Sequence, residues 1–536
     1  MYHAEDHTAA FLYRLGVIML FAAEIMIISS SLYADEPVSE QRVPSVIPGP
    51  AVMTLRSGTF TLQPGTVIVV DKEAQAAGRY LAALLTPATG YRVAVKESSQ
   101  KANYMRLSID HTLDRLGREG YSLEVTVNAV IIRAPDAAGL FYGIQTLRQL
   151  LPPRIESAAR VGKNVVWSVP CITIEDKPRF GWRGFMLDCS RTFWDKEYIK
   201  RTIDLLALYK LNVFHLHLTD DQGWRVEIKK HPELTRIGSQ FAPRFKGEHN
   251  GYYSQDDIRE IVAYADERHV TIVPEIEMPG HCLAALTAYP ELSCTGKRFE
   301  IHPYSVGPGI HEDVFCAGND RVFEILEDVL SEVVELFPSA FIHIGGDECP
   351  KTRWKTCEKC QARIKAEGLR DEHELQSYFI RRIEKFLNTK NRRLIGWDEI
   401  LEGGLAENAT VMSWRGVEGG IAAARANHDV VMSPTSHCYF DYEYSTTSLE
   451  KVYSFEPVPP ALEQSQARYI LGAQANMWTH IARTEASVDS QVFPRLMALA
   501  EVAWSPKENR DFNDFYRRVG NQYPRLDLLG VSYHKK

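Results

Sequence analysis

The residues of this sequence best suited to acid–base chemistry are two adjacent carboxylates, Asp347 and Glu348. They follow an apolar run at 340–344 and the pair Gly345-Gly346, which lets backbone approach a ligand closely. Neighbouring side chains on extended backbone point in opposite directions. Both acids can therefore reach one pocket only if the chain bends, and two acids in different environments can then hold different pKa values and roles.

Other polar and aromatic residues also follow short apolar runs. They are Asp188, Asp220, Asp221, Glu277, Trp397, Asp398, Glu399, Trp414 and Trp478. Any one of them alone would be read as a capping carboxylate or a wall aromatic. If the runs are parallel strands, their carboxyl ends meet at one edge, and these side chains converge there.

The apolar runs predict the framework that positions these residues. Eight strand-like runs begin at Arg183, Asn212, Val270, Ala340, Arg393, Thr410, Asp429 and Tyr469. Amphipathic helices are expected between them, for example at 198–211, 255–268 and 321–337, because apolar residues recur there at i, i+3 and i+4. This alternation predicts an α/β fold with a (β/α)8 TIM barrel as the catalytic domain, over residues 172–536.

A smaller domain precedes the predicted barrel. Residues 35–171 show short strands at 66–70 and 123–127 and helices at 74–85 and 138–151, so we predict a small N-terminal α/β domain.

Residues 1–34 resemble a signal peptide, because an apolar segment at 15–32 follows Arg14 and precedes a polar stretch. The alternative is a membrane anchor, since the segment is nearly long enough to span a bilayer. Glu24 and the serines at 29–31 weaken that alternative. Cleavage near Ala34 predicts an exported protein, periplasmic, cell-surface or secreted, without a stable membrane anchor.

Nine cysteines are consistent with an oxidising compartment, although an odd number leaves one unpaired. We expect a disulfide between Cys294 and Cys316, which bracket a polar loop. Cys349, Cys357 and Cys360 lie close together in the sequence, where the CxxC motif could be a redox pair, half a zinc site or a local disulfide. A zinc site needs four ligands and only three cysteines are visible there, so a structural disulfide is favoured.

The overall charge excludes one class of partner. The chain of 536 residues has a net charge of -8 and no Lys/Arg-rich run, so it has no basic surface for nucleic acid. A neutral or weakly charged substrate is compatible with this composition.

Several motifs together resemble glycoside hydrolase family 20. They are HIGGDE from His343, HLHLTDDQGWR from His215, PEIEMPGH from Pro274, RGFMLDCSR from Arg183 and MALAEVAWS from Met497. The resemblance covers residues 178–504. It implies a β-N-acetylhexosaminidase that removes terminal N-acetylglucosamine or N-acetylgalactosamine from a glycan and uses no cofactor or metal.

The resemblance also implies catalytic roles. Glu348 would protonate the glycosidic oxygen and later deprotonate water, while Asp347 would orient the 2-acetamido group of the substrate. That group would be the nucleophile and form an oxazolinium intermediate, a mechanism that retains configuration. Asp220 and His281 would form a relay behind Glu348, the family motif favouring Asp220 over Asp221.

The binding residues implied by the resemblance surround the sugar. Arg183, supported by Asp188, would bind sugar hydroxyls, and Asp441 would bind another. Tyr439 would donate to the acetamido oxygen. The acetamido methyl and the ring would be enclosed by Trp397, Trp414 and Trp478. Family members commonly carry a glutamate where this chain has His480, which predicts altered or relaxed discrimination at O4 and O6.

Two other functions compete with this interpretation. A metal-dependent hydrolase could use the pair His215 and His217 with His281, His343 and Asp347. A non-catalytic glycan-binding protein could have the same fold.

Overall fold

In the computed structural model, the described residues are 44–535 except 99–100, 163 and 308. The predicted signal peptide at 1–34 lies outside them. Within this described part of the chain, no helix has both the length and the apolar character needed to cross a bilayer. Residues 45–536 form one compact unit.

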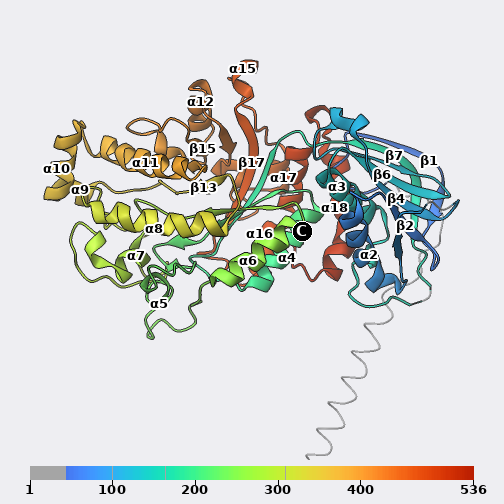
Figure 1. The fold of residues 1–536 in the computed structure, drawn as a ribbon, viewed down its shortest axis with the longest axis horizontal. Helices are drawn as coiled ribbons and strands as arrows, with labels where there is room; N and C mark the ends of the chain where they lie inside the picture. Colours follow the sequence, from blue (N-terminus) through green and yellow to red (C-terminus); the bar gives the residue numbers. More distant parts are fainter. Residues whose placement is uncertain (1–43, 99–100, 163, 308, 536) are drawn as a thin grey trace, which may run out of the picture. The chain divides into compact units, whose positions relative to one another are not determined.

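The N-terminal part of this unit is a seven-stranded mixed sheet with two long helices (Figure 1). The strand order is β1-β7-β5-β6-β4-β2-β3, antiparallel from β1 to β6 and parallel from β6 to β3. The elements are β1 (Val52–Thr61), β2 (Val67–Val70), α2 (Gln75–Thr89), β3 (Ala94–Lys96), β4 (Tyr104–Ile109), β5 (Tyr121–Val125), β6 (Ala129–Ala134), α3 (Ala137–Leu150) and β7 (Ser168–Asp176).

Local sequence explains where the two helices begin and end. Asp136 caps α3 by accepting a hydrogen bond from the backbone N–H of Ala138, and Gly90 ends α2 in the left-handed conformation that glycine adopts without strain. Strand β7 runs across the domain boundary predicted at 171/172, so the whole strand belongs to this sheet.

The remainder is the predicted closed barrel of eight parallel strands. All eight predicted runs are barrel strands, namely β8 (Trp182–Asp188), β9 (Val213–His217), β12 (Thr271–Glu275), β13 (Phe341–His343), β14 (Arg393–Trp397), β15 (Thr410–Ser413), β16 (Val430–Met432) and β17 (Ile470–Met477). Every residue of β9, β15 and β16 is buried, as expected for strands enclosed on both faces.

Helices cover the outside of the barrel, and α8 and α11 lie side by side (Figure 1). They include α4 (Lys196–Leu208), α6 (Gln255–Asp266), α8 (Asp320–Leu336), α11 (Glu372–Thr389), α12 (Glu418–Arg425), α16 (Glu485–Val492), α17 (Arg495–Trp504) and α18 (Phe512–Leu528). One unit departs from the βα alternation, because β14 and β15 are joined through the single 3-10 turn η4 (Asp398–Leu401) instead of an α-helix. That turn brings Asp398 and Glu399 to the carboxyl end of the barrel.

Long loops with short helices stand at the carboxyl ends of the strands. They contain the pair β10 (Thr219–Asp220) and β11 (Gly223–Trp224), and the helices α5 (Glu233–Arg236), α7 (Leu283–Ala288), α9 (Thr352–Thr356), α10 (Glu358–Glu367), α13 (Thr435–Cys438), α14 (Leu449–Tyr453) and α15 (Gln464–Ala467). These loops carry most of the polar residues singled out from the sequence.

The cysteines differ from the prediction. All nine are free thiols, so the structure does not contain the expected Cys294–Cys316 disulfide or one within the CxxC motif. Cys294 Sγ lies 3.7 Å from Cys360 Sγ, and Cys316 Sγ lies 3.7 Å from the sulfurs of both Cys357 and Cys360. Cys349 does not belong to this group.

Candidate active site

The backbone bends sharply where β13 ends, as the adjacent carboxylates require. Gly345 and Gly346 have φ values of 69° and 93°, and Glu348 itself lies at φ 42°. Left-handed backbone is uncommon for a residue with a long side chain and costs of order 1 kcal/mol or more. Its occurrence at Glu348 shows that the surrounding structure holds the backbone here in a defined conformation, whereas the side chain itself is 37% exposed.

The Gly-Gly pair serves a different contact from the one expected. A Cβ atom on Gly345 would lie 1.8 Å from Oε1 of Glu277, and the backbone N–H of Gly346 donates to the same oxygen at 3.1 Å. The glycines thus allow the backbone to approach the carboxyl group of Glu277, a residue of the site, where a ligand had been expected.

His281 connects the carboxylates of two other loops. Its Nδ1 lies 3.2 Å from Asp221 Oδ2 and 3.4 Å from Asp220 Oδ1. Its Nε2 lies 3.4 Å from Glu348 Oε2 and 3.7 Å from Asp347 Oδ2. The structure therefore places the ring between the two pairs of acids, with both Asp220 and Asp221 within reach.

Charges raise the basicity of this histidine. Burial alone would lower the pKa of His281, but Asp220, Asp221 and Glu348 outweigh that effect and hold its pKa well above the usual range. The backbone of His281 has a φ of 45°, so His281 is a second left-handed residue of the site in addition to Glu348. A ring held as an imidazolium donates from both nitrogens, so it can link an acid on each side.

Asp347 and Glu277 form a buried pair of acids. Burial raises the pKa of both groups; the charge of Asp347 adds to this effect at Glu277, whereas the charge of His281 opposes it at Asp347. The proton of the pair therefore belongs on Glu277, which leaves Asp347 as the ionised partner. One oxygen of Asp347, Oδ1, is buried without a hydrogen-bond partner in the structure, and so is Glu277 Oε2.

Arg191 is the basic residue of this site. Its Nη2 lies 2.7 Å from Asp220 Oδ2, its Nε donates to Gln222 at 2.9 Å, and its guanidinium stacks over the ring of Trp478 at 4.9 Å. Asp188 accepts from the backbone N–H of Arg191 at 3.0 Å and so positions the loop. Nη1 is buried without a hydrogen-bond partner and lies 3.6 Å from Asp188 Oδ2, with which it forms an ion pair.

The prediction that Arg183 binds substrate is wrong. Arg183 is the second residue of β8 and Asp188 the last, so the two lie roughly 16 Å apart along the strand, at opposite ends of the barrel. The buried guanidinium of Arg183 instead donates to Glu119 of the N-terminal domain at 2.7 and 2.9 Å and to Lys210 O at 2.8 Å. It joins the two domains at the amino end of the barrel.

Aromatic residues line the site, and the structure brings together all four that were expected to do so. Ring centroids of Trp397 and Trp478 are 5.9 Å apart, those of Trp414 and Tyr439 6.1 Å, and those of Tyr439 and Trp478 6.4 Å. Carboxylates fix two of the indoles: Trp397 donates to Glu275 and Trp414 to Glu399, each at 2.8 Å. We call this group of four rings the aromatic cage.

Two polar groups stand beside the aromatic cage. Burial raises the pKa of Tyr439 well above its usual range, so its hydroxyl keeps the proton and can donate. Burial also raises the pKa of Asp441 to about 7, and its Oδ1 has no hydrogen-bond partner in the structure. Both groups are therefore available to a polar ligand.

His480 lies next to the aromatic cage, two residues beyond Trp478. Its ring packs against Tyr304 with centroids 4.6 Å apart. Burial, followed by the charge of Arg191, lowers the pKa of His480. The side chain is therefore a neutral imidazole at neutral pH, whereas a glutamate there would carry a negative charge.

The residues expected to bind a metal in a metal-dependent hydrolase fall into two separate groups. His215, His217 and His343 surround Glu275, with His215 Nε2 at 3.1 Å and His343 Nδ1 at 2.8 Å from its oxygens. His217 is held on both sides, by Glu275 at Nδ1 and by Asp220 at Nε2. Because His281 and Asp347 meet at Glu348 instead, the five residues do not form one ligand set.

The charge at His217 links this buried group to the site. Burial alone would lower its pKa, but the carboxylates of Glu275 and Asp220 outweigh burial and raise the pKa of His217 to about 10. Burial alone would raise the pKa of Asp220, but the charges of Arg191 and His281 and the hydrogen bond from His217 outweigh burial and hold it well below its usual range. These histidines stabilise the charges beneath the aromatic cage.

Sequence reasoning missed three groups of this site. The roles of Arg191, Glu275 and the Glu277–Asp347 pair depend on contacts between loops far apart in the chain. A signal was present for Arg191, which follows Asp188 by three residues just beyond the end of a barrel strand. Position at the carboxyl end of the strand favours Arg191 over Arg183.

Family models match nearly all of the described chain. The model described as "Glycosyl hydrolase family 20, catalytic domain" matches residues 180–507, and "Glycosyl hydrolase family 20, domain 2" matches residues 43–177. The two matches correspond to the barrel and to the smaller sheet domain.

Individual proteins are similar over most of their length. A beta-hexosaminidase of Porphyromonas gingivalis is 44% identical over 96% of this chain and 68% of its own. A beta-N-acetylhexosaminidase of Cellulomonas fimi is 33% identical over 91% of this chain and 96% of its own. The solved structure of Streptomyces plicatus N-acetyl-beta-hexosaminidase in complex with Thio-NAglucal superposes with a TM-score of 0.83, at 33% identity, over 93% of this chain and 98% of its own.

Proposed function

The chain belongs to glycoside hydrolase family 20 and is a β-hexosaminidase, and from this premise we propose that it removes terminal N-acetylhexosamine residues with retention of configuration. The proposed mechanism is substrate-assisted, with the 2-acetamido group of the sugar as nucleophile. We propose the β-N-acetylglucosaminide and β-N-acetylgalactosaminide ends of glycans as substrates.

The observation that carries this mechanism is the meeting of Asp347 and Glu348 at one nitrogen of His281, at 3.7 and 3.4 Å. A retaining enzyme with its own nucleophile places the two acids across the sugar ring, about 5 to 5.5 Å apart. Two neighbouring acids on one side of the sugar suit a reaction in which the substrate supplies the nucleophile.

In the first step, the acetamido carbonyl oxygen forms a bond to the anomeric carbon as the glycosidic C–O bond breaks. Glu348 gives its proton to the departing oxygen, and Asp347 accepts a hydrogen bond from the acetamido N–H as positive charge develops on the forming ring. Tyr439 donates to the acetamido oxygen, and the aromatic cage encloses the methyl group. The product of this step is an oxazolinium ion.

In the second step, Glu348 removes a proton from water, whose oxygen attacks the anomeric carbon and opens the oxazolinium ring. Two inversions at that carbon restore the original configuration. His281 couples the charge on Glu348 to Asp220 and Asp221, so the proton can leave and return to the same carboxylate. Arg191 and Asp441 bind sugar hydroxyls in both steps.

The mechanism is tested with p-nitrophenyl glycosides. We expect turnover of the β-N-acetylglucosaminide and none of the β-glucoside, because only the first carries the nucleophile. Brief exposure to EDTA should leave the rate unchanged, and proton NMR should show the β-anomer of N-acetylglucosamine as the first product.

The competing outcomes are distinct. Hydrolysis of the β-glucoside or an α-anomeric first product would contradict substrate assistance. Rapid loss of activity in EDTA would indicate the metal-dependent hydrolase, and sugar binding without turnover would indicate the binding protein. Exo action predicts that chitotriose is shortened by one N-acetylglucosamine at a time, so internal cleavage of longer chains would contradict it.

Two arginine variants separate substrate binding from domain joining. Arg191→Lys should raise KM about tenfold, since a lost hydrogen bond is worth about 1 to 1.5 kcal/mol, with little loss of stability. Arg183→Met should leave KM unchanged and lower the free energy of unfolding by about 3 kcal/mol, because it removes the cation that pairs with the largely buried Glu119. Steady-state kinetics and urea denaturation measure the two effects, and each variant is the control for the other. A KM effect at Arg183 would contradict the corrected assignment.

The substitution at His480 predicts relaxed discrimination at C4. A neutral imidazole accepts one hydrogen bond, whereas a glutamate accepts bonds from two hydroxyls, so wild type should turn over gluco and galacto substrates at similar kcat/KM. His480→Glu should gain a preference of about tenfold for the gluco substrate, worth about 1.4 kcal/mol. We would measure kcat/KM for both p-nitrophenyl substrates, with His480→Gln as the uncharged control. An unchanged ratio in His480→Glu would remove the basis for this role.

We also propose that the mature enzyme acts outside the cytoplasm, in the periplasm, at the cell surface or after secretion. The support is the signal-like segment at residues 1–34. N-terminal sequencing of the exported protein should give a start near Asp35, and an intact residue 1 would contradict cleavage.

A further inference from the structure

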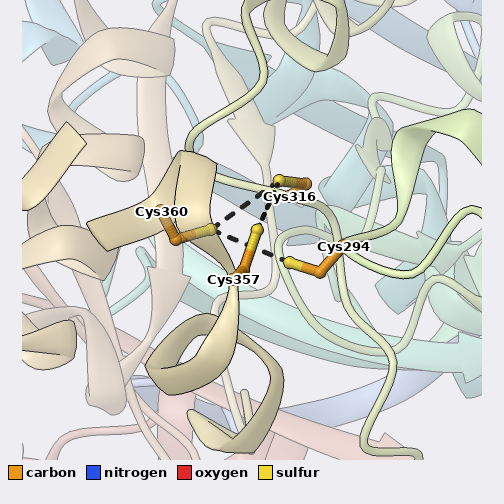
Figure 2. Close-up of side chains that lie close together, drawn as sticks. All are labelled: Cys294, Cys316, Cys357 and Cys360. Atoms are coloured by element: carbon orange, nitrogen blue, oxygen red, sulfur yellow. Dashed lines mark hydrogen bonds between the residues drawn. The ribbon is translucent and has the colours of Figure 1, made fainter. Parts of the chain in front are cut away.

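Four cysteines from two separate loops meet at one point (Figure 2). We call them the four-cysteine cluster: Cys294, Cys316, Cys357 and Cys360. Figure 2 shows the four sulfur atoms directed toward one another, with the two members of the CxxC motif on one side and the other two facing them.

The distances between the sulfur atoms can be compared with those in a disulfide and in a zinc site. Three of the pairs are separated by 3.7 Å, and all four atoms lie within 4.8 Å of one another. A disulfide requires about 2.05 Å. A tetrahedral zinc ion with Zn–S bonds of about 2.3 Å sets its sulfur atoms about 3.8 Å apart. The spacing therefore fits ligands around one ion and exceeds that of two disulfides.

The backbone around the cluster is built for this arrangement. Ser293 and Phe315 form an antiparallel bridge, and the N–H of Cys316 donates to Leu292 O at 2.8 Å, which brings Cys294 and Cys316 together. Cys357 and Cys360 stand at the start of α10, on the first turn of a helix. A C-x2-C pair on a tight turn is a common zinc-binding unit.

Close packing joins the two halves of the cluster. A Cβ atom on Gly318 would lie 2.2 Å from the carbonyl carbon of Lys359 and 2.4 Å from the nitrogen of Cys360. Only glycine allows the loop after Cys316 to approach the CxxC turn so closely. Trp354 reinforces this contact by donating its indole N–H to Phe315 O at 2.9 Å.

We propose that the four-cysteine cluster binds one zinc ion as a structural site. All four ligand positions would be taken by thiolates, so the ion has no open position for substrate or water and takes no part in hydrolysis. Tetrahedral sulfur coordination suits zinc and iron, and zinc is chosen because it needs no redox partner. The prediction from the sequence counted only three cysteines for such a site, because it grouped Cys349 with the CxxC motif.

The ion would tie together two loops that lead from the barrel into the active site. Cys294 and Cys316 lie on the connection between β12 and α8, which also carries His281. The CxxC motif lies on the connection between β13 and α11, which carries Glu348. Metal binding therefore stabilises both catalytic loops by closing a link between them.

Metal content and thiol count test the site without relying on activity. We would purify the full mature chain without added reductant or chelator, and measure zinc and iron by mass spectrometry. We expect about one zinc per chain, and nine thiols after denaturation in EDTA, because every cysteine is then reduced. Two disulfides within the cluster would leave five thiols and no zinc.

Variants locate the bound metal. Cys360→Ser and Cys294→Ser should each lose zinc and lower the Tm, whereas Cys171→Ser, at a buried cysteine outside the cluster, should keep it. Cobalt(II) in place of zinc should give the visible absorption of tetrahedral thiolate coordination in wild type and lose it in Cys360→Ser. Wild type with five thiols, with iron in place of zinc, or with nine thiols and no metal would each overturn the proposal.

Discussion

Replacing Glu348 with glutamine should lower kcat by a factor of about 10² to 10⁴, the range associated with losing a general acid–base. Glutamine keeps the size of the side chain and its position near His281 but cannot give up or take a proton. The loss should depend on the leaving group. Para-nitrophenolate departs without protonation, so hydrolysis of chitobiose should suffer more than hydrolysis of the p-nitrophenyl glycoside.

The measurement is kcat and KM for both substrates in wild type and in Glu348→Gln. Glu73→Gln, which makes the same substitution at an exposed site in the N-terminal domain, controls for the change of charge. Equal losses for the two leaving groups would argue that Glu348 acts on something other than the departing oxygen, and near-normal kcat would remove it from the catalytic machinery.

Replacing Asp347 with asparagine should lower kcat by about 10² to 10³, the effect of removing one preorganised electrostatic partner of the transition state. The buried, unpartnered Oδ1 of Asp347 is the acceptor expected for the acetamido N–H. Asparagine presents a neutral group to a positively charged intermediate. Because this defect lies in the nucleophile, the loss should be similar for good and poor leaving groups.

The comparison between the two variants is therefore the sharper test. Asp347→Asn and Glu348→Gln would be assayed on the same pair of substrates, with the exposed Asp266→Asn as the matched control. A leaving-group dependence in Asp347→Asn like that of Glu348→Gln would mean that the assigned roles are wrong. Unchanged kcat in Asp347→Asn would contradict substrate assistance through this residue.

Strand periodicity and the adjacent carboxylates were readable from the sequence because each is a local property. All eight barrel strands coincide with predicted runs, since a buried parallel strand is a short continuous apolar segment. Residues at strand ends then converge whatever the loops do, which is why Glu348 and the three tryptophans could be predicted from their positions alone. His281 and Tyr439 were predicted only from the resemblance to the family. The missing helix between β14 and β15 changes none of these positions.

Arg183 and Arg191 show where local reasoning ends. Both belong to one motif, and only the direction of β8 through the barrel decides which of them reaches the site. The partner of Arg183 is Glu119, from the other domain, so no pattern near Arg183 indicates it. Similarly, Glu277 is a strand-end acid by sequence, but its protonation depends on its burial beside Asp347.

The sequence by itself determined the fold, the family and the two central acids, because these depend on the order of apolar and polar residues along the chain. Only the tertiary structure decided which arginine enters the site, which acid of the Glu277–Asp347 pair holds the proton and which four cysteines meet. These outcomes depend on distances between loops that are tens of residues apart, and on the burial that such contacts create. Distances between side chains and their desolvation determine which acids are ionised and which cysteines lie together, and neither can be read from the spacing of residues along the chain.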